Sequence, residues 1–338
     1  MGKDDPVTDK GILTRPIGRS GIEASAVGLG TWAIGGWMWG GTDEAESISA
    51  IHASLDAGVS LIDTAPAYGM GLAETIVGKA IAGQRDKVVL VSKCGLVWHV
   101  GEGTYFFEQA SKPVHRYLGP SSIRYEVEQS LRRLDTDYID HYVTHWQDTT
   151  TPIAETVGEL LRLKDEGKIR SIGASNVSEA DLAAYLATGA LDAIQEEYSM
   201  VKRDIETSFV PTCIDNGVSI LSYSSLALGL LSGKIGPDRV FADDDQRHGN
   251  PRFSFSNREK VARLMTVIDP IADQHKASVA QVVIAWTVAQ SGITFSLCGA
   301  RDPTQAIENA GAARLRLTEN DVSTITTGIR DHLVELDR

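Results

Sequence analysis

The feature that most constrains the fold is a regular alternation between short apolar runs and amphipathic helical stretches, which starts near residue 25 and continues to about residue 300. The apolar runs are rich in β-branched residues, and the intervening stretches, such as 44–58, 123–136 and 153–168, carry apolar residues at helical spacing. This alternation predicts parallel strands joined by crossover helices. The expected strands are 25–30, 58–63, 87–93, 138–145, 169–175, 192–198, 217–224 and 293–299.

Eight β–α units in a chain of 338 residues predict a single α/β domain, a (β/α)8 TIM barrel over residues 1–338, with a flexible segment at 1–12. The alternative is an open doubly wound sheet. That fold would be expected to carry the spacing GxGxxG directly after an early strand, and the glycine-rich stretch 30–41 does not have it.

Three segments lie outside the repeat. Residues 14–25 have the turn signals of a β-hairpin, which we expect to close the bottom of the barrel. Residues 94–120 and 233–256 follow the third and seventh expected strands, and we expect both to be long loops at the carboxyl-terminal mouth. Loops of this length in a compact domain usually bind ligands or act as lids.

Composition narrows the functional classes. The chain has 45 acidic and 32 basic residues, a net charge of −13, which disfavours nucleic acid and anionic membranes as partners. Cys94, Cys213 and Cys298 are widely spaced, so neither a disulfide framework nor a thiolate zinc site is indicated, and we expect a reducing, cytoplasmic location. No stretch has the roughly 18 apolar residues that would span a bilayer. A small molecule is the expected partner, and the oligomeric state stays open.

Polar residues lie at the carboxyl ends of most of the expected strands. Active sites of such barrels lie at the carboxyl ends of the strands, so these residues would converge on one mouth. Each alone has an ordinary structural explanation, as a cap, a solvated charge or a core histidine. Together they place an acid, a base and an imidazole on neighbouring strands. The residues are Asp63, Lys93, His145, Ser175 with Asn176, Gln195 and Tyr223.

A metal-dependent hydrolase is a competing hypothesis, because Asp63, His141 and His145 are potential ligands. At about 3.3 Å per residue, the two histidines lie roughly 13 Å apart on one strand, too far to share an ion. We therefore predict no metal site. His141 has the inward parity of His145 and is expected to be a core histidine with a hydrogen-bond partner.

Tyr68 follows Asp63 by five residues and supplies a proton donor. With it, the chain resembles the aldo-keto reductases over residues 13 to about 320, including bacterial general-stress and inositol-type reductases and barrels that act as channel β-subunits. The motifs, in order, are LIDTAPAYG, AETIVGKAI, VSK, YIDHYVTHW, GKIRSIGASN, IQEEYSM, SYSSLALGLLSGK and GARDPTQAIENAGA. The resemblance implies a barrel that transfers hydride between a nicotinamide cofactor and a carbonyl or alcohol.

The residues themselves suit that chemistry. Reduction of a carbonyl needs a proton and stabilisation of charge on oxygen. A tyrosine with a pKa near 10 is a weak acid, so we expect the ammonium of Lys93 to lower the pKa of Tyr68, and Asp63 to neutralise the buried ammonium. His145 would orient the substrate oxygen. The resemblance implies the same four catalytic roles.

The resemblance also implies an extended NADP(H) over the barrel mouth. Arg301 is a cation suited to a phosphate, which favours NADPH over NADH. The pattern departs from the family at Gly299 and Gln305, where many members have lysine or arginine, and at Ser225, where proline is usual. The expected contacts are Thr31, Trp32, Asp63, Ser175, Asn176, Gln195 and Tyr223 toward the nicotinamide, Ser224, Leu226, Leu228, Gly229 and Lys234 toward the pyrophosphate, and Gly299, Arg301, Gln305, Glu308 and Asn309 toward the adenosine.

Aromatic residues are expected to line the substrate pocket. Trp32, Trp98 and Trp146 are the first candidates, with Tyr105, Phe106 and His99 as further ones. Aromatic walls suit sugar faces and cyclic ketones alike, so the expected substrates are aldehydes, ketones or sugar-like compounds. The alternative function is a nicotinamide-binding accessory or sensor subunit with little turnover.

Overall fold

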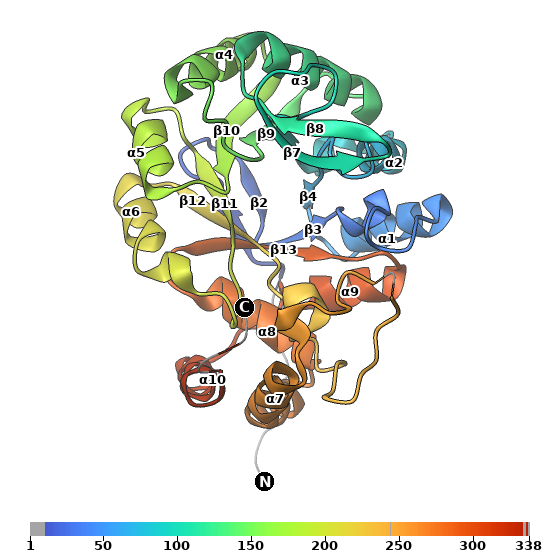
Figure 1. Ribbon diagram of the computed structural model, residues 1–338. Helices are drawn as coiled ribbons and strands as arrows, with labels where there is room; N and C mark the ends of the chain where they lie inside the picture. Colours follow the sequence, from blue (N-terminus) through green and yellow to red (C-terminus); the bar gives the residue numbers. More distant parts are fainter. Residues whose placement is uncertain (1–10, 244, 334–335, 337–338) are drawn as a thin grey trace.

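A closed barrel of eight parallel strands forms the centre of the computed structural model, which describes residues 11–243, 245–333 and 336 (Figure 1). All eight expected strands and the TIM-barrel architecture are confirmed, although several strands are shorter at their amino ends than expected. In ring order the strands are β3 (Val27–Gly30), β4 (Leu61–Asp63), β5 (Val89–Cys94), β9 (Ile139–Thr144), β10 (Ile169–Ser175), β11 (Ala193–Glu197), β12 (Ser219–Tyr223) and β13 (Ile293–Gly299).

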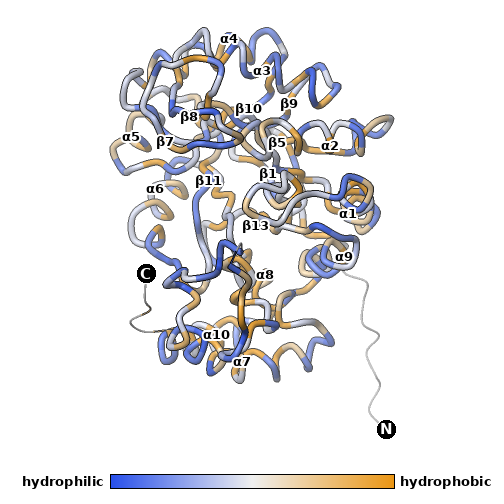
Figure 2. Tube along the Cα trace, turned by 45° about the vertical axis from the view of Figure 1, so that its right-hand side comes forward, coloured by the Kyte–Doolittle hydropathy of each residue, from blue (hydrophilic) through white to orange (hydrophobic). Residues whose placement is uncertain are grey.

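Helices surround the barrel, and α7 (Phe255–His275) and α10 (Glu319–His332) pack against each other outside this ring (Figure 1). Their hydrophobic and hydrophilic residues alternate along the chain, as Figure 2 shows, because one face of each helix is buried. Among the described residues, no helix is both long enough and apolar enough to cross a membrane. The ring helices are α1 (Glu44–Asp56), α2 (Leu72–Ile81), α3 (Pro120–Leu134), α4 (Ile153–Asp165), α5 (Glu179–Ala187), α6 (Phe209–Asn216), α8 (Val279–Ala289) and α9 (Pro303–Gly311).

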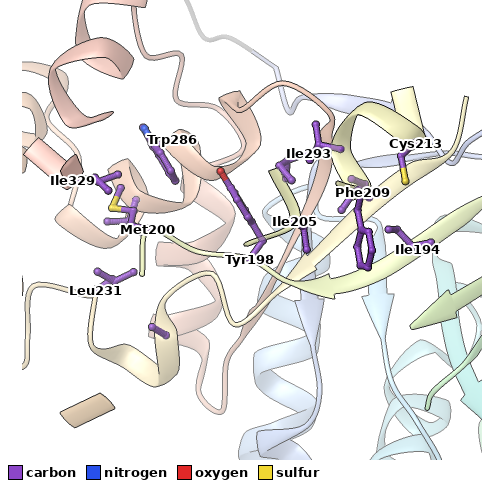
Figure 3. Close-up of a cluster of buried hydrophobic side chains, with 14 of the residues drawn as sticks. Ile194, Tyr198, Met200, Ile205, Phe209, Cys213, Leu231, Trp286, Ile293 and Ile329 are labelled. Atoms are coloured by element: carbon purple, nitrogen blue, oxygen red, sulfur yellow. The ribbon is translucent and has the colours of Figure 1, made fainter. Parts of the chain in front are cut away.

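The largest apolar cluster fills the space between the strands and the helices. Figure 3 shows part of it, where side chains from β11, α6 and α8 meet. The rings of Tyr198 and Trp286 stack there, with centroids 6.3 Å apart and planes 5° apart. This packing fixes the end of β11, which carries residues of the site described below.

The predicted hairpin at residues 14–25 is confirmed as β1 (Thr14–Pro16) paired antiparallel with β2 (Glu23–Ser25). It closes the bottom of the barrel, since Ile17 is fully buried among the side chains of the barrel interior. Arg15 donates from Nη1 to the Ile293 carbonyl at 2.7 Å, at the amino end of β13. The predicted flexible segment falls mainly on residues 1–10, outside the described residues, and Ile12 packs beside β3.

The segment 94–120 is not a loop, so that expectation is wrong. It forms a three-stranded antiparallel sheet of β6 (Leu96–Val97), β8 (Lys112–Arg116) and β7 (Thr104–Gln109). Ala110 and Ser111, both with positive φ (49° and 57°), make the two-residue turn between β7 and β8. Turns of this kind usually carry Asn-Gly or Asp-Gly, so Ala110 and Ser111 do not indicate a hairpin at this place.

The segment 233–256 fits the expected long loop better. Its described residues form no regular element before the short 3₁₀ turn Pro251–Phe253 and the start of α7 at Phe255. Arg252 ties this end of the loop to the barrel by an ion pair with Glu197 at 2.8 Å.

Candidate active site

The centre of the site is the ammonium group of Lys93, which lies on β5 and is 1% exposed. Its Nζ donates to both carboxylate oxygens of Asp63, at 2.7 and 2.9 Å, and to the carbonyl of Thr64 at 3.0 Å. Tyr68 completes the contacts, with its hydroxyl 3.1 Å from Nζ. Neighbouring strands β4 and β5 thus bring a buried ion pair directly against a phenol.

Tight backbone packing positions Tyr68. A Cβ atom added to Gly35 would lie 2.6 Å from the Tyr68 carbonyl carbon, so the segment after β3 presses directly on the Tyr68 backbone. Gly69, with φ of 70°, allows the chain to turn immediately afterwards. His145, at the end of β9, faces the phenol edge-on, with ring centroids 5.7 Å apart and planes 83° apart.

Burial dominates the protonation of Tyr68. It raises the pKa of the phenol, while the nearby Lys93 lowers that pKa by a smaller amount, so the pKa lies above its ordinary value. Lys93 lowers the pKa as expected, but the cost of a buried phenolate is larger than the attraction to the ammonium, so the net pKa is raised. Tyr68 consequently stays protonated at neutral pH, as a proton donor must.

The neighbours of Tyr68 have equally defined charges. Burial lowers the pKa of Lys93, but Asp63 and Tyr68 together raise it above its usual value, so the side chain remains an ammonium. Burial and then the charge of Lys93 hold the pKa of His145 well below its usual value. His145 is therefore neutral at pH 7 and carries one N–H that can donate to a substrate oxygen.

The residues expected to hold the nicotinamide form a hydrogen-bonded chain beside this centre. Gln195 donates from Nε2 to Asp63 Oδ2 at 2.8 Å, and Ser175 donates from Oγ to the Gln195 carbonyl at 2.6 Å. Asn176 donates from Nδ2 to the His145 carbonyl at 2.9 Å and accepts from the Tyr223 hydroxyl at 2.7 Å. The ends of β9, β10, β11 and β12 are thereby coupled to the ion pair.

The residues expected near the pyrophosphate follow β12 in an unusual backbone conformation. Ser224, Ala227, Leu228 and Gly229 all have positive φ, at 58°, 48°, 57° and 91°. When successive residues adopt such conformations, their backbone N–H groups can point to one side of the chain and bind an anion there. The side chains of Leu226 and Leu228 pack on the apolar cluster of Figure 3 instead.

The residues expected near the adenosine are partly engaged with one another. Lys234 and Glu308, assigned to different parts of the cofactor, form an ion pair at 2.7 Å. Asn309 donates from Nδ2 to the Gly299 carbonyl at 3.0 Å, and Gln305 accepts from the Arg301 backbone N–H at 3.3 Å. These contacts gather the predicted residues on one side of the mouth, between β12 and α9.

Arg301 turns toward the first loop of the mouth. Its Nη1 donates to the Trp39 carbonyl at 2.8 Å, and its guanidinium lies 5.8 Å from the Trp39 ring centroid. Trp32 and Thr31 belong to the same loop, where Trp32 meets Trp39 edge-on and Thr31 Oγ1 donates to the Asp63 carbonyl at 2.9 Å. The loop after β3 thus connects the catalytic centre with the segment that carries Arg301.

Aromatic residues at the mouth pack around the small sheet of β6, β7 and β8. Trp146 packs on Phe106 of β7, with centroids 5.1 Å apart, and Phe107 stacks on Trp37 at 5.0 Å. Trp98 packs against the same apolar cluster as Phe106, Phe107 and Trp146. It also lines a small cavity of about 80 Å³ together with Pro66, Leu96, His99, Tyr125, Glu126, Gln129 and Arg133.

His141 is confirmed as a core histidine. Its Nδ1 lies 2.8 Å from Ser171 Oγ, and a Cβ atom added to Gly173 would lie 2.4 Å from its Nε2, so the ring fills the space above that glycine. Burial, then Lys93 and Lys164, lower its pKa to about 3. Within the described ranges, no group of three or more His, Cys, Asp or Glu side chains is arranged to hold a metal ion.

Sequence reasoning missed two polar residues beside the site. Gln147 donates from Nε2 to the Ser175 carbonyl at 2.8 Å, and Glu196 accepts from the Val177 N–H at 2.9 Å. Gln147 lies in an irregular segment after His145, where no periodicity gives its direction. Glu196 points to the opposite side of β11 from Gln195, so only the backbone of the next turn reveals its role.

Comparison with known proteins gives the family and the same fold. The family model described as the aldo/keto reductase family matches residues 26–329. The chain belongs to this family. It is 41% identical over 314 residues to the NADH-specific methylglyoxal reductase of Escherichia coli (strain K12), covering 91% of this chain and 95% of that protein.

Solved structures agree with this assignment. The glycerol dehydrogenase AKR11B4 from Gluconobacter oxydans superposes with a TM-score of 0.84 at 36% identity, over 97% of this chain and 98% of that one. An aldo-keto reductase from Klebsiella pneumoniae in complex with NADPH gives a TM-score of 0.69 at 28% identity, over 92% of each chain. The chain is therefore an oxidoreductase of this family.

Proposed function

We propose that this aldo/keto reductase transfers a hydride between NADP(H) and a small aldehyde, ketone or sugar-like carbonyl, with Tyr68 as general acid. One observation carries the proposal: a single buried ammonium, that of Lys93, contacts both the Asp63 carboxylate and the Tyr68 hydroxyl. An ion pair held this close to a phenol has little structural value of its own, because burying charges is costly. It does supply a positive charge where a phenolate forms.

The residues have distinct roles in carbonyl reduction. The bound cofactor supplies the hydride to the carbonyl carbon. Tyr68 gives its proton to the carbonyl oxygen, which completes the alcohol, and the resulting phenolate is stabilised by Lys93 at 3.1 Å. Asp63 keeps Lys93 charged, and neutral His145 donates a hydrogen bond that orients the oxygen. Alcohol oxidation reverses these steps, with Tyr68 accepting the proton.

The residues of the mouth fit a nicotinamide dinucleotide. Asn176 and Gln195 carry amide groups, which match the donors and acceptors of a carboxamide, and Tyr223 offers a flat ring. The turn after β12 has the positive φ angles that are found in phosphate-binding backbone. The related Klebsiella pneumoniae protein with bound NADPH supports this assignment.

The preference for NADPH rests on Arg301 and is expected to be small. Arg301 is bound to Trp39, and its neighbour Asp302 carries a negative charge at the amino end of α9. An acidic residue at this position would repel the phosphate that distinguishes NADPH from NADH. The Escherichia coli relative named for NADH specificity supports use of NADH, and the Klebsiella pneumoniae protein in complex with NADPH supports use of NADPH.

Aromatic side chains support small carbonyl substrates. Trp146, which follows His145 in the chain, packs on Phe106, and Trp32 lies in the loop after β3, whose Trp37 stacks on the neighbouring Phe107. We assign the protein to the cytoplasm, since its cysteines Cys94, Cys213 and Cys298 are free and buried.

Turnover of an activated aldehyde tests the proposal. We expect the purified protein to oxidise NADPH over many turnovers with 4-nitrobenzaldehyde, and to accept at least one member of a panel of aldehydes, keto-sugars and cyclic ketones. Tight binding of NADPH with no turnover of any of them would refute the reductase and favour a sensor subunit.

A further inference from the structure

Glu196 is a buried carboxylate that the catalytic mechanism above does not use. It lies on β11 directly after Gln195, is 7% exposed, and none of the ion pairs found among the described residues includes it. Its Oε1 accepts the Val177 backbone N–H at 2.9 Å, and the Asn176 N–H also points at the carboxylate while it donates to the Gln195 carbonyl at 3.3 Å. Burying a charge with only backbone donors around it is costly.

The turn that Glu196 holds is the one that carries Ser175 and Asn176. Asn176 has φ of 55°, a left-handed conformation that costs energy for a residue with a side chain. This conformation aims the Asn176 amide at the His145 carbonyl and at the Tyr223 hydroxyl. The carboxylate binds the Val177 N–H and lies beside the Asn176 N–H, so it can hold the backbone of this left-handed turn in place.

We infer that Glu196 is a positioning residue for the nicotinamide end of the cofactor, acting through the backbone of Asn176 and Val177. The inference rests on the proposed function, because it assigns the turn to cofactor binding. Replacement by Gln leaves one acceptor oxygen but turns an NH2 group toward the second backbone N–H. Two donors then face each other, so the turn loses one hydrogen bond.

The charge of Glu196 has a cost that can be measured. Burial raises its pKa to about 7, against the opposite effect of the Val177 and Asn176 N–H groups. Because the pKa is higher in the folded protein than in the unfolded chain, the folded state loses stability as pH rises from the unfolded pKa through about 7. Cys213 on α6 and Tyr223 on β12 also face Glu196, but burial raises the pKa of the thiol to about 12 and that of the phenol further, so neither titrates here.

Asp192 provides a matched control. It precedes β11 at the opposite end of the strand, is also 7% exposed, and accepts the Ile172 backbone N–H of β10 at 3.0 Å. Burial raises the pKa of Asp192 as well. Unlike Glu196, Asp192 also forms an ion pair with Lys164, at 3.8 Å. Asp192→Asn thus makes the same chemical change as Glu196→Gln between the same two strands, at the bottom of the barrel, and its effect on stability includes the loss of that ion pair.

The experiment compares both variants with the wild type in two measurements. We expect Glu196→Gln to weaken NADPH and NADH binding about three- to tenfold, the effect of one lost hydrogen bond, and to speed amide exchange at Asn176 and Val177 in the free protein. Asp192→Asn should leave both cofactor dissociation constants unchanged. In Glu196→Gln, the melting temperature should gain relative to wild type as pH rises from about 5 to about 8.

Each outcome bears on a different claim. Altered stability in Glu196→Gln with unchanged cofactor affinity would show that the carboxylate is only structural and would overturn the inference alone. Equal loss of affinity in Asp192→Asn would overturn it as well, since the effect would not depend on the turn. A wild-type protein that binds neither NADPH nor NADH would overturn the proposed function together with this inference.

Discussion

Removal of the Asp63 charge is the perturbation whose cost follows most directly from the structure. In Asp63→Asn, one carboxylate oxygen becomes an NH2 group that must face either Lys93 Nζ or Gln195 Nε2, both of which are donors. Lys93 is then a buried ammonium without a counter-charge. Loss of one partner of a buried ion pair costs about 3 to 5 kcal/mol.

The expected change in melting temperature follows from the length of the chain. An unfolding entropy of about 2.1 cal/mol/K per residue gives about 0.7 kcal/mol/K for 338 residues, so the variant should melt about 4 to 7 °C lower. The pKa of Lys93 is raised in the folded protein, so its contribution is complete below the ordinary lysine pKa and is lost only as pH rises through the higher folded value. In the wild type, this contribution should therefore be constant across neutral pH.

A surface ion pair serves as the control. Lys79 and Glu44 lie 2.7 Å apart with side chains 51% and 48% exposed, so Glu44→Gln should cost less than about 1 kcal/mol. Thermal unfolding followed by tryptophan fluorescence measures both variants. If Asp63→Asn melted no lower than Glu44→Gln, the account of Lys93 as a buried charge held by Asp63 would be wrong.

Three further predictions concern the cofactor, acid stability and the barrel bottom. Arg301→Ala should weaken NADPH binding more than NADH binding, and Asp302→Ala should strengthen NADPH binding more than NADH binding. Equal changes for both cofactors, measured by fluorescence titration, would remove the basis of the preference. His141 has a pKa of about 3 in the folded protein. Between about pH 3 and the ordinary histidine pKa, it is therefore neutral in the folded protein and protonated in the unfolded chain. His141→Gln should therefore reduce the loss of stability on acidification in that window by about 1.4 kcal/mol per pH unit, as urea unfolding at several pH values can test. Ile17→Ala should cost about 2 to 5 kcal/mol in the same urea assay, since Ile17 is fully buried, and a cost near zero would contradict its role in closing the barrel.

The barrel and the convergence of polar residues at its mouth could be predicted from the sequence because both follow from periodicity. Strand parity and topology alone place Asp63, Lys93 and His145 at one mouth, and the structure brings them together with Tyr68. The hairpin β7–β8 could not be predicted, because Ala110 and Ser111 adopt positive φ without the residue types that announce such a turn.

The net direction of a pKa shift and the contacts of side chains with the backbone could not be predicted from the sequence either. The direction of the Tyr68 pKa depends on whether burial or the Lys93 charge is larger, which only the packing decides. Glu196 has no motif of its own, and its importance comes from backbone N–H groups of a neighbouring turn. Arg301 is a cation in the expected place, yet Trp39 sets its direction.

The most direct test of the central claim is the rate of 4-nitrobenzaldehyde reduction by Tyr68→Phe, measured beside its dissociation constant for NADPH. The phenyl ring keeps the packing against His145 and removes only the hydroxyl that lies 3.1 Å from Lys93 Nζ. We expect kcat to fall by about 10² to 10⁴, the usual contribution of a general acid, with the dissociation constant changed less than about twofold. A variant that still reduces the aldehyde within about tenfold of the wild-type rate would contradict Tyr68 as the proton donor.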